Sequence, residues 1–142
     1  MEKIIDKIKN NNLNINLIIP TFNEAKSIEN IVSTFLHLKN IGILSEIYII
    51  DDGSTDKTVE IVSRYDVIVF SRKKEGDKKY RKYNGKGFAI WESLKFVSDD
   101  IMVIYDGDVK NPSVFQLINL IKPLLDDSGL ILTKANFERN LF

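Results

Sequence analysis

The chain has 142 residues, of which 44% are hydrophobic and 28% charged, with 20 basic and 20 acidic side chains and no cysteine. These proportions suit a single globular domain over residues 1–142 that buries a moderate core, and they exclude a disordered chain. The lack of cysteine excludes a disulfide framework and a thiolate metal site. The balanced charge gives no indication of nucleic-acid binding.

The apolar segments of the chain are short. None approaches the roughly 18 residues that are needed to cross a bilayer, and the first six residues lack the apolar core of a signal peptide. We therefore expect no transmembrane segment and a cytoplasmic location.

The apolar pattern predicts strands that alternate with helices. Strands are expected where Ile, Val and Leu run continuously, and helices where apolar residues recur every three or four positions. Strands are predicted at 16–20, 46–51 and 100–106, with weaker ones at 66–70 and 130–135. Helices are predicted at 1–10, from a Ser27 cap through 36, from a Ser54 or Thr55 cap through 64, at 85–97, and from an Asn111-Pro112 start to an end or kink at Pro123. This order predicts an α/β fold: a mostly parallel sheet with helices on both faces, joined by right-handed crossovers.

Asp106-Gly107-Asp108 directly follows the strand predicted at 100–106. Ligands of parallel α/β sheets bind outside the carboxyl ends of the strands. Two carboxylates at this point can bind a divalent ion that also holds phosphates. An ordinary turn is the alternative interpretation of these three residues.

Polar segments also follow the first two predicted strands. Residues 20–24, Pro-Thr-Phe-Asn-Glu, offer polar groups for a base or ribose, and residues 51–56 place two aspartates after a buried strand. A carboxylate in the position of Asp51 needs a partner to offset desolvation, and it is a candidate acceptor from a uracil N–H or a ribose hydroxyl. A turn followed by a helix cap is the alternative for both segments.

Gly85-Lys86-Gly87 begins the helix predicted at 85–97, after the basic segment 71–86. The glycines allow close backbone approach, the helix N-terminus favours anions, and the lysine adds a positive charge. The spacing of a P-loop is absent. Trp91, with Phe88 and Leu94, is interpreted as a core residue.

Together, segments 17–24, 49–56 and 106–108 resemble the nucleotide-sugar half of family 2-type glycosyltransferases with the GT-A fold, a Rossmann-like nucleotide-diphospho-sugar transferase fold. Within that group, segments 84–94, 106–108 and 132–139 resemble glucosyl-3-phosphoglycerate synthases and their mannosyl relatives. These are retaining transferases that join a sugar from a nucleotide donor to 3-phosphoglycerate. The resemblance thus implies a UDP-glucose or GDP-sugar donor and 3-phosphoglycerate as acceptor.

The resemblance also implies roles for the nucleoside side of the site. Pro20, Thr21 and Glu24 would line the nucleoside pocket, and Asp52 would face the base.

On the diphosphate side, the resemblance implies that Gly85 and Lys86 would contact the base or the diphosphate. Asp108 would lead the binding of Mg²⁺ or Mn²⁺, and Asp106 would support it. A divalent ion and a lysine can stabilise the charge of a departing nucleoside diphosphate without proton transfer.

No catalytic residue is assigned. The resemblance implies that the acceptor pocket and a further histidine metal ligand come from polypeptide beyond residue 142. Completion by such a C-terminal half, or a homodimer, is therefore expected, and donor binding rather than sugar transfer is the activity expected of residues 1–142.

Three alternatives remain open. The first is an inverting family 2 transferase acting on polyprenyl phosphate or polysaccharide, and the second is a non-catalytic nucleotide-sugar-binding module. The third is a phosphoacceptor receiver domain, in which Asp51-Asp52, Asp106 and Lys134 would form the acidic site. The receiver is disfavoured because its acidic pair should follow the first strand, and because it leaves the 20–24 segment without a role.

Overall fold

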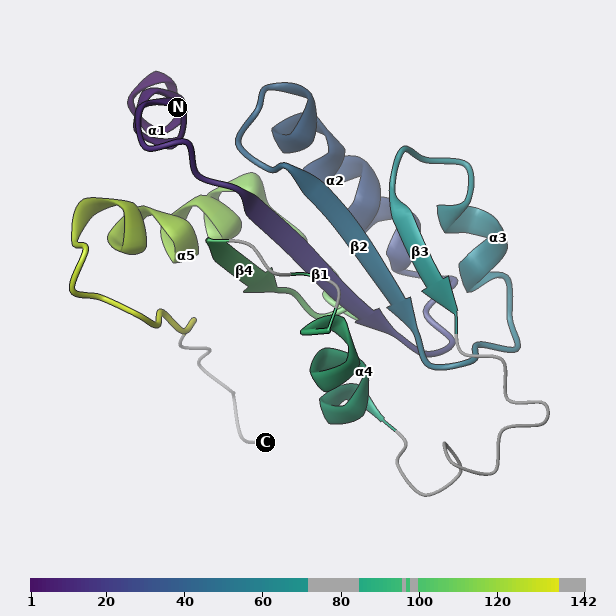
Figure 1. Cartoon of the computed structure of the whole chain (residues 1–142). Coiled ribbons are helices and arrows are strands. Elements are labelled where there is room, and N and C mark those ends of the chain that lie inside the picture. Colours follow the sequence, from purple (N-terminus) through teal and green to yellow (C-terminus); the bar gives the residue numbers. More distant parts are fainter. Residues whose placement is uncertain (72–84, 96, 98–99, 136–142) are drawn as a thin grey trace, which may run out of the picture.

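A computed structural model describes residues 1–71, 85–95, 97 and 100–135, which build a four-stranded parallel sheet with helices (Figure 1). The strands are β1 (Ile15–Thr21), β2 (Glu46–Asp51), β3 (Ile68–Ser71) and β4 (Ile101–Ile104), in the spatial order β3-β2-β1-β4. Most of the basic segment 71–86 lies outside the described residues.

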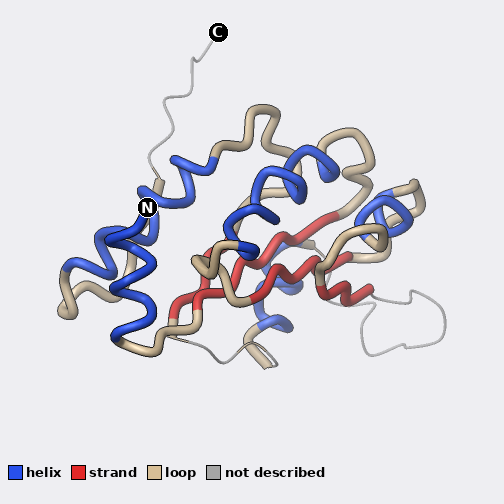
Figure 2. Tube along the Cα trace, turned by 90° about the horizontal axis from the view of Figure 1, so that it is seen from above, coloured by secondary structure: helices blue, strands red, loops and turns tan. Residues whose placement is uncertain are grey.

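Helices lie on both faces of this sheet (Figure 2). They are α1 (Glu2–Asn10), α2 (Ile28–Asn40), α3 (Thr58–Val62), α4 (Lys86–Ser93) and α5 (Val114–Asp126). The predicted α/β class, with a mostly parallel sheet covered on both sides, is confirmed. None of the described helices is long and apolar enough to span a membrane.

The alternation of side chains along each strand divides the core between two faces. Leu17 and Ile19 of β1 point into the larger cluster, which includes Phe35 of α2, and Ile18 between them points into a smaller cluster with Ala89 of α4. All four side chains of residues 17–19 and 35 are fully buried. The continuous Ile and Leu run in β1 is thus explained by burial on both faces.

The topology creates a crevice beside β1. The chain passes from β1 to β2 and β3 on one side, and β4 lies on the other side of β1. In open parallel sheets, such a reversal of strand order opens a crevice at the carboxyl ends of the two neighbouring strands from which the chain leaves in opposite directions. Here these strands are β1 and β4, and they are followed by the 20–24 and 106–108 segments.

The prediction of a strand at 130–135 is wrong. These residues form no strand, and Ile131 is 94% exposed. The Thr133 hydroxyl instead donates to the Leu120 carbonyl of α5 at 2.6 Å. The segment has the composition of a strand. A strand also needs a neighbouring strand with which to form hydrogen bonds, and composition alone does not provide one.

Several predicted helix boundaries also differ. α3 begins at Thr58 rather than after a Ser54 or Thr55 cap, and it has only five residues. α5 begins after Ser113, whose hydroxyl accepts from the Phe115 N–H at 3.3 Å, while the Gln116 side chain accepts from the Ser113 N–H at 3.1 Å. This capping box satisfies helix N–H groups and replaces the expected Asn111-Pro112 start.

Two further expectations about helices need correction. α5 does not end at Pro123 but continues to Asp126, because packing of its apolar face outweighs local propensity. Trp91 was interpreted as core, but it is 54% exposed, tilted against the Phe88 ring at 5.5 Å and covered by the Lys95 ammonium at 4.0 Å.

Candidate functional site

A pocket of about 360 Å³ opens at the carboxyl end of the sheet, beside β1 and β4. It brings together eight residues for which the sequence predicts a role in the site, although they come from four separate segments, and the candidate Asp51 is not among them. Phe22, Ala89 and Gly107 complete it. The lining residues are Pro20, Thr21, Phe22, Glu24, Asp52, Gly85, Lys86, Ala89, Asp106, Gly107 and Asp108.

The loop after β1 is held rigidly by the loop after β2. The Asn23 side-chain oxygen Oδ1 accepts from the Thr55 N–H at 2.8 Å, and the Asn23 backbone N–H donates to the Ser54 hydroxyl at 2.8 Å. The Glu24 N–H donates to the hydroxyl of the fully buried Thr58 at 2.8 Å. Asn23 adopts a φ of 59°, in the left-handed region that asparagine tolerates better than most residues. These bonds fix the part of the pocket that contains Thr21 and Glu24.

Asp51 and Asp52 have different surroundings. Asp51 is fully buried and accepts hydrogen bonds from the Ser71 hydroxyl at 2.6 Å and from the Ser54 N–H at 3.0 Å. The prediction that Asp51 binds a uracil or a ribose is therefore wrong, since its carboxylate is engaged within the protein. A buried carboxylate needs such donors to offset its lost hydration.

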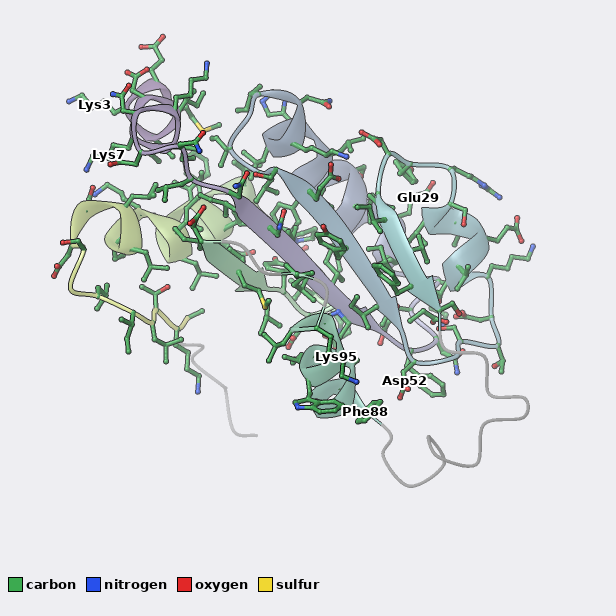
Figure 3. The ribbon with its side chains drawn as sticks, viewed as in Figure 1. Lys3, Lys7, Glu29, Asp52, Phe88 and Lys95 are labelled. Carbon is green, nitrogen blue, oxygen red and sulfur yellow. The ribbon has the colours of Figure 1, made fainter. Side chains whose placement is uncertain are left out.

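Asp52, by contrast, lines the pocket. Its carboxylate accepts from the Gly85 N–H at 2.8 Å, and its own N–H donates to the Thr21 carbonyl at 2.9 Å. Figure 3 shows Asp52 beyond the end of β2, on the side where α4 carries Phe88 and Lys95. Asp52 therefore joins the ends of β1 and β2 to the start of α4.

The charge of the pocket is mainly negative. Glu24, Asp52, Asp106 and Asp108 face it, and Lys86 carries the only positive charge among the described lining residues. The Lys86 ammonium forms an ion pair with the Asp106 carboxylate. A diphosphate entering these surroundings needs additional positive charge, because like charges at close range repel strongly.

Asp106 and Asp108 fit a divalent ion that is shared with a ligand. Both side chains are exposed, and they follow β4 on one short loop. The described residues contain no group of three or more His, Cys, Asp or Glu side chains placed to hold a metal ion. Mg²⁺ is commonly bound by one or two carboxylates, with water and substrate phosphates completing its coordination. Two carboxylates beside a pocket match that pattern.

Glu24, in the loop after β1, lies beside the Asp106-Gly107-Asp108 loop, which is called the aspartate loop below. Burial raises the pKa of its carboxyl above 4.5, the polar Ser27 hydroxyl 3.2 Å away opposes this, and the negative charges of Asp108 and Asp56 add to the rise. The pKa of Glu24 therefore depends on the charge at Asp108, and a cation bound at Asp108 would favour the ionised form of Glu24.

Thr21 has an unused hydrogen-bonding group. Its side chain is 3% exposed and lines the pocket, and its hydroxyl has no hydrogen-bond partner among the residues that the structure describes. Buried hydroxyls are nearly always paired in native proteins. The Thr21 hydroxyl is therefore available to a ligand.

The aspartate loop packs directly on the β1 loop at Gly107. A Cβ atom added to Gly107 would lie 3.1 Å from the Pro20 carbonyl oxygen and 3.1 Å from Thr21 Cγ2. The Ser27 hydroxyl donates to the Gly107 carbonyl at 2.7 Å. The sequence indicated Ser27 only as a helix cap, and no local signal reveals a contact across 80 residues.

Comparisons with known proteins agree with this fold. Residues 16–133 match the model of glycosyl transferase family 2, so the chain belongs to this family. Glucosyl-3-phosphoglycerate synthase of Mycobacterium tuberculosis is 33% identical over 127 residues, which are 89% of this chain and 39% of that protein. The receiver-domain alternative disagrees with this assignment.

Solved structures of other proteins have a similar fold. The crystal structure of the Mycobacterium tuberculosis synthase with Mn²⁺, UDP-glucose and phosphoglyceric acid has a TM-score of 0.79 and 29% identity, covering 91% of this chain and 44% of that one. Mannosyl-3-phosphoglycerate synthase of Rubrobacter xylanophilus shares the fold, with a TM-score of 0.79 at 22% identity over 89% of this chain and 41% of its own.

A relative with a different acceptor is also similar. Dolichol-phosphate mannosyltransferase of Pyrococcus furiosus is 32% identical over 116 residues, which are 78% of this chain and 30% of that protein. The chain thus spans less than half the length of each of these relatives.

Proposed function

We propose that this chain is the nucleotide-sugar-binding part of a glycosyltransferase that transfers glucose from UDP-glucose to 3-phosphoglycerate with retention of configuration. One observation carries the proposal: the pocket at the ends of β1 and β4 gathers the segments 20–24, 85–86 and 106–108, in a chain similar to an enzyme crystallised with Mn²⁺, UDP-glucose and phosphoglyceric acid. Mannose and a GDP-sugar donor are the neighbouring possibilities.

The nucleoside is proposed to bind between the β1 loop and the start of α4. The Thr21 hydroxyl is buried and finds no partner within the described part of the chain, and the Asp52 carboxylate lies at the same pocket. A hydroxyl can donate to or accept from a base or ribose, and a carboxylate accepts from N–H and O–H groups. Pro20 and Glu24 would line the remaining wall on this side.

The diphosphate is proposed to bind between Lys86 and the aspartate loop. Asp108 and Asp106 would hold Mg²⁺ or Mn²⁺, which when bound supplies positive charge next to the diphosphate. Lys86 would exchange its ion pair with Asp106 for a contact with the diphosphate, and the Gly85 backbone allows close approach. Stabilising the charge of the leaving nucleoside diphosphate in this way lowers the barrier to sugar transfer.

A polyprenyl phosphate acceptor is the second candidate. It is favoured by the 32% identity to a dolichol-phosphate mannosyltransferase over 78% of this chain. The pocket described here serves the donor in both cases, so the acceptor distinguishes the two functions. A module that binds the donor without transferring it is the third outcome.

A product assay tests the proposal. The protein, together with any polypeptide encoded beside it, is incubated with radiolabelled UDP-glucose, Mn²⁺ and 3-phosphoglycerate, and parallel reactions contain undecaprenyl phosphate or no acceptor. The proposal predicts a labelled phosphoglycerate glycoside whose anomeric configuration equals that of the donor. Label in the lipid fraction would support the second candidate, and an inverted product would contradict retention.

Two attributes complete the proposal. Phosphoglycerate and nucleotide sugars are charged solutes that do not enter a bilayer unaided, so a cytoplasmic location is part of it. A homodimer would be detected by sedimentation of the same preparation.

A further inference from the structure

Ser27 occupies the position before α2, where a serine side chain normally caps the helix. Its hydroxyl makes no capping hydrogen bond to α2. It donates instead to the Gly107 carbonyl at 2.7 Å, in the loop after β4. A serine before a helix usually caps it, and here the hydroxyl serves a contact with a distant loop instead.

The neighbouring acceptors do not change this assignment. The Glu24 carboxylate lies 3.2 Å from the Ser27 hydroxyl oxygen and the Glu24 carbonyl lies 3.3 Å from it. A hydroxyl has one proton to donate, and the Gly107 carbonyl is its shortest contact. The Glu24 carbonyl already accepts from the N–H groups of Ser27 and Ile28, both at 3.0 Å.

The accepting carbonyl lies between the two proposed metal ligands. Gly107 separates Asp106 from Asp108, and a hydrogen bond to its carbonyl restrains the peptide group between Gly107 and Asp108. The same glycine contacts the β1 loop so closely that an added Cβ would meet Pro20 and Thr21 at 3.1 Å. The loop is thus held by a hydrogen bond on one side and by packing on the other.

We propose that Ser27 is a positioning residue that fixes the Asp106-Gly107-Asp108 loop for binding of a divalent cation together with a nucleoside diphosphate. This inference rests on the proposed function and adds a residue to it. Residues that orient metal ligands through hydrogen bonds affect metal affinity strongly, although they do not touch the ion. Ser27 also joins the start of α2 to the aspartate loop, so the nucleoside side and the metal side of the pocket share one support.

The test compares Ser27→Ala and Ser27→Thr with Ser33→Ala. Ser33 is an exposed serine on the same helix whose hydroxyl donates to the Asn30 carbonyl at 3.1 Å, so its replacement makes the same chemical change away from the pocket. The affinity for UDP with Mn²⁺ is measured by calorimetry, and the weak binding of UDP with EDTA by saturation-transfer NMR. Melting temperature is measured for every protein.

The Ser27→Ala variant should lose about tenfold in Mn²⁺-dependent UDP affinity. Its melting temperature and its UDP binding in EDTA should match those of the wild type. Ser27→Thr, which keeps the hydroxyl, should restore the affinity, and Ser33→Ala should have no effect. If Ser27→Ala does not fold, Gly107→Ala displaces the same loop from its other side and should reduce the Mn²⁺-dependent affinity in the same way.

Two results would overturn the positioning role. One is an unchanged Mn²⁺-dependent affinity in Ser27→Ala. The other is a parallel loss of melting temperature and of both affinities, which would make Ser27 a structural residue. A wild-type protein that fails to bind UDP with Mn²⁺ would overturn the proposed function and this inference together. In that case the wild type and all the variants would show the same lack of UDP binding.

Discussion

The Asp52 carboxylate accepts a hydrogen bond from the Gly85 N–H at 2.8 Å, which joins the end of β2 to the start of α4. Lys86, the next residue, forms an ion pair with Asp106 after β4. The start of α4 therefore contacts loops on both sides of the central strand β1. These two contacts place Lys86 and the carboxylates of Asp52 and Asp106 around one pocket, and the predictions below test what the groups at this pocket and elsewhere contribute.

Replacing Asp108 by Asn should weaken the binding of UDP-glucose with Mn²⁺ by at least about tenfold, or about 1.4 kcal/mol. The change removes a ligand charge on an exposed side chain rather than a packing contact, so the melting temperature should stay the same or rise. A rise would follow from reduced repulsion with Asp106. Calorimetry and thermal unfolding measure the two effects.

Asp6→Asn is the matched control, because it makes the same charge change on an exposed residue of α1. Equal binding losses in the two variants would indicate a general charge effect. A large fall in the melting temperature of Asp108→Asn without metal would make Asp108 a structural residue.

Lys86→Met should lower the affinity for the nucleoside diphosphate by about 1–3 kcal/mol if the ammonium contacts the diphosphate. Lys95→Met serves as the control, since this ammonium lies over the Trp91 ring at 4.0 Å on the same segment. Calorimetric titration with UDP and Mn²⁺ measures both affinities. The same small effect at both positions would contradict a direct role for Lys86.

Asp51→Ala should destabilise the fold by about 3 kcal/mol, because it leaves the Ser71 hydroxyl and buried N–H groups without their acceptor. Asp66→Ala, which removes a largely exposed carboxylate, should cost much less. Urea unfolding measures both free energies. An Asp51→Ala protein of normal stability that no longer binds UDP would restore Asp51 as a ligand-binding residue.

The contact between α1 and α5 should weaken in acid. Hydrogen bonds from Lys7 and Lys122 lower the pKa of the Asp126 carboxyl below 3.8. A carboxyl whose pKa is depressed by folding stabilises the folded state above the unfolded-state value, and this contribution is lost as the pH falls through the folded-state value.

Asp126→Asn should therefore lower the melting temperature slightly at pH 7, and the difference from the wild type should vanish below the folded-state pKa. The effect is small because the carboxylate and both lysines are substantially exposed. Asp127→Asn is the neighbouring control. A difference that persists unchanged from pH 7 to pH 2 would contradict the ion-pair explanation.

The sequence predicted most of the candidate site because strand ends are visible in it. The Ile and Val runs end at Thr21, Asp51 and Asp106, or within two residues of them, and parallel strands bring their carboxyl ends to one edge. The polar segments at those ends therefore had to lie close together. The grouping of these polar segments could therefore be predicted from local sequence.

What the sequence did not predict depends on contacts between distant residues. Nothing local distinguishes Asp51, which is engaged by Ser71, from Asp52, which lines the pocket. The bond from Ser27 to Gly107 likewise replaces an expected helix cap. The segment 130–135 has strand composition, but no described strand pairs with it.

The most direct test of the account is calorimetric titration of the chain with UDP-glucose, in Mn²⁺ and separately in EDTA. Four carboxylates line the pocket against a single lysine among the described residues, so a diphosphate should need the added cation. The account predicts saturable binding with one site per chain in Mn²⁺ and no measurable heat of binding in EDTA. Equal affinity in the two conditions, or no binding in either, would contradict it.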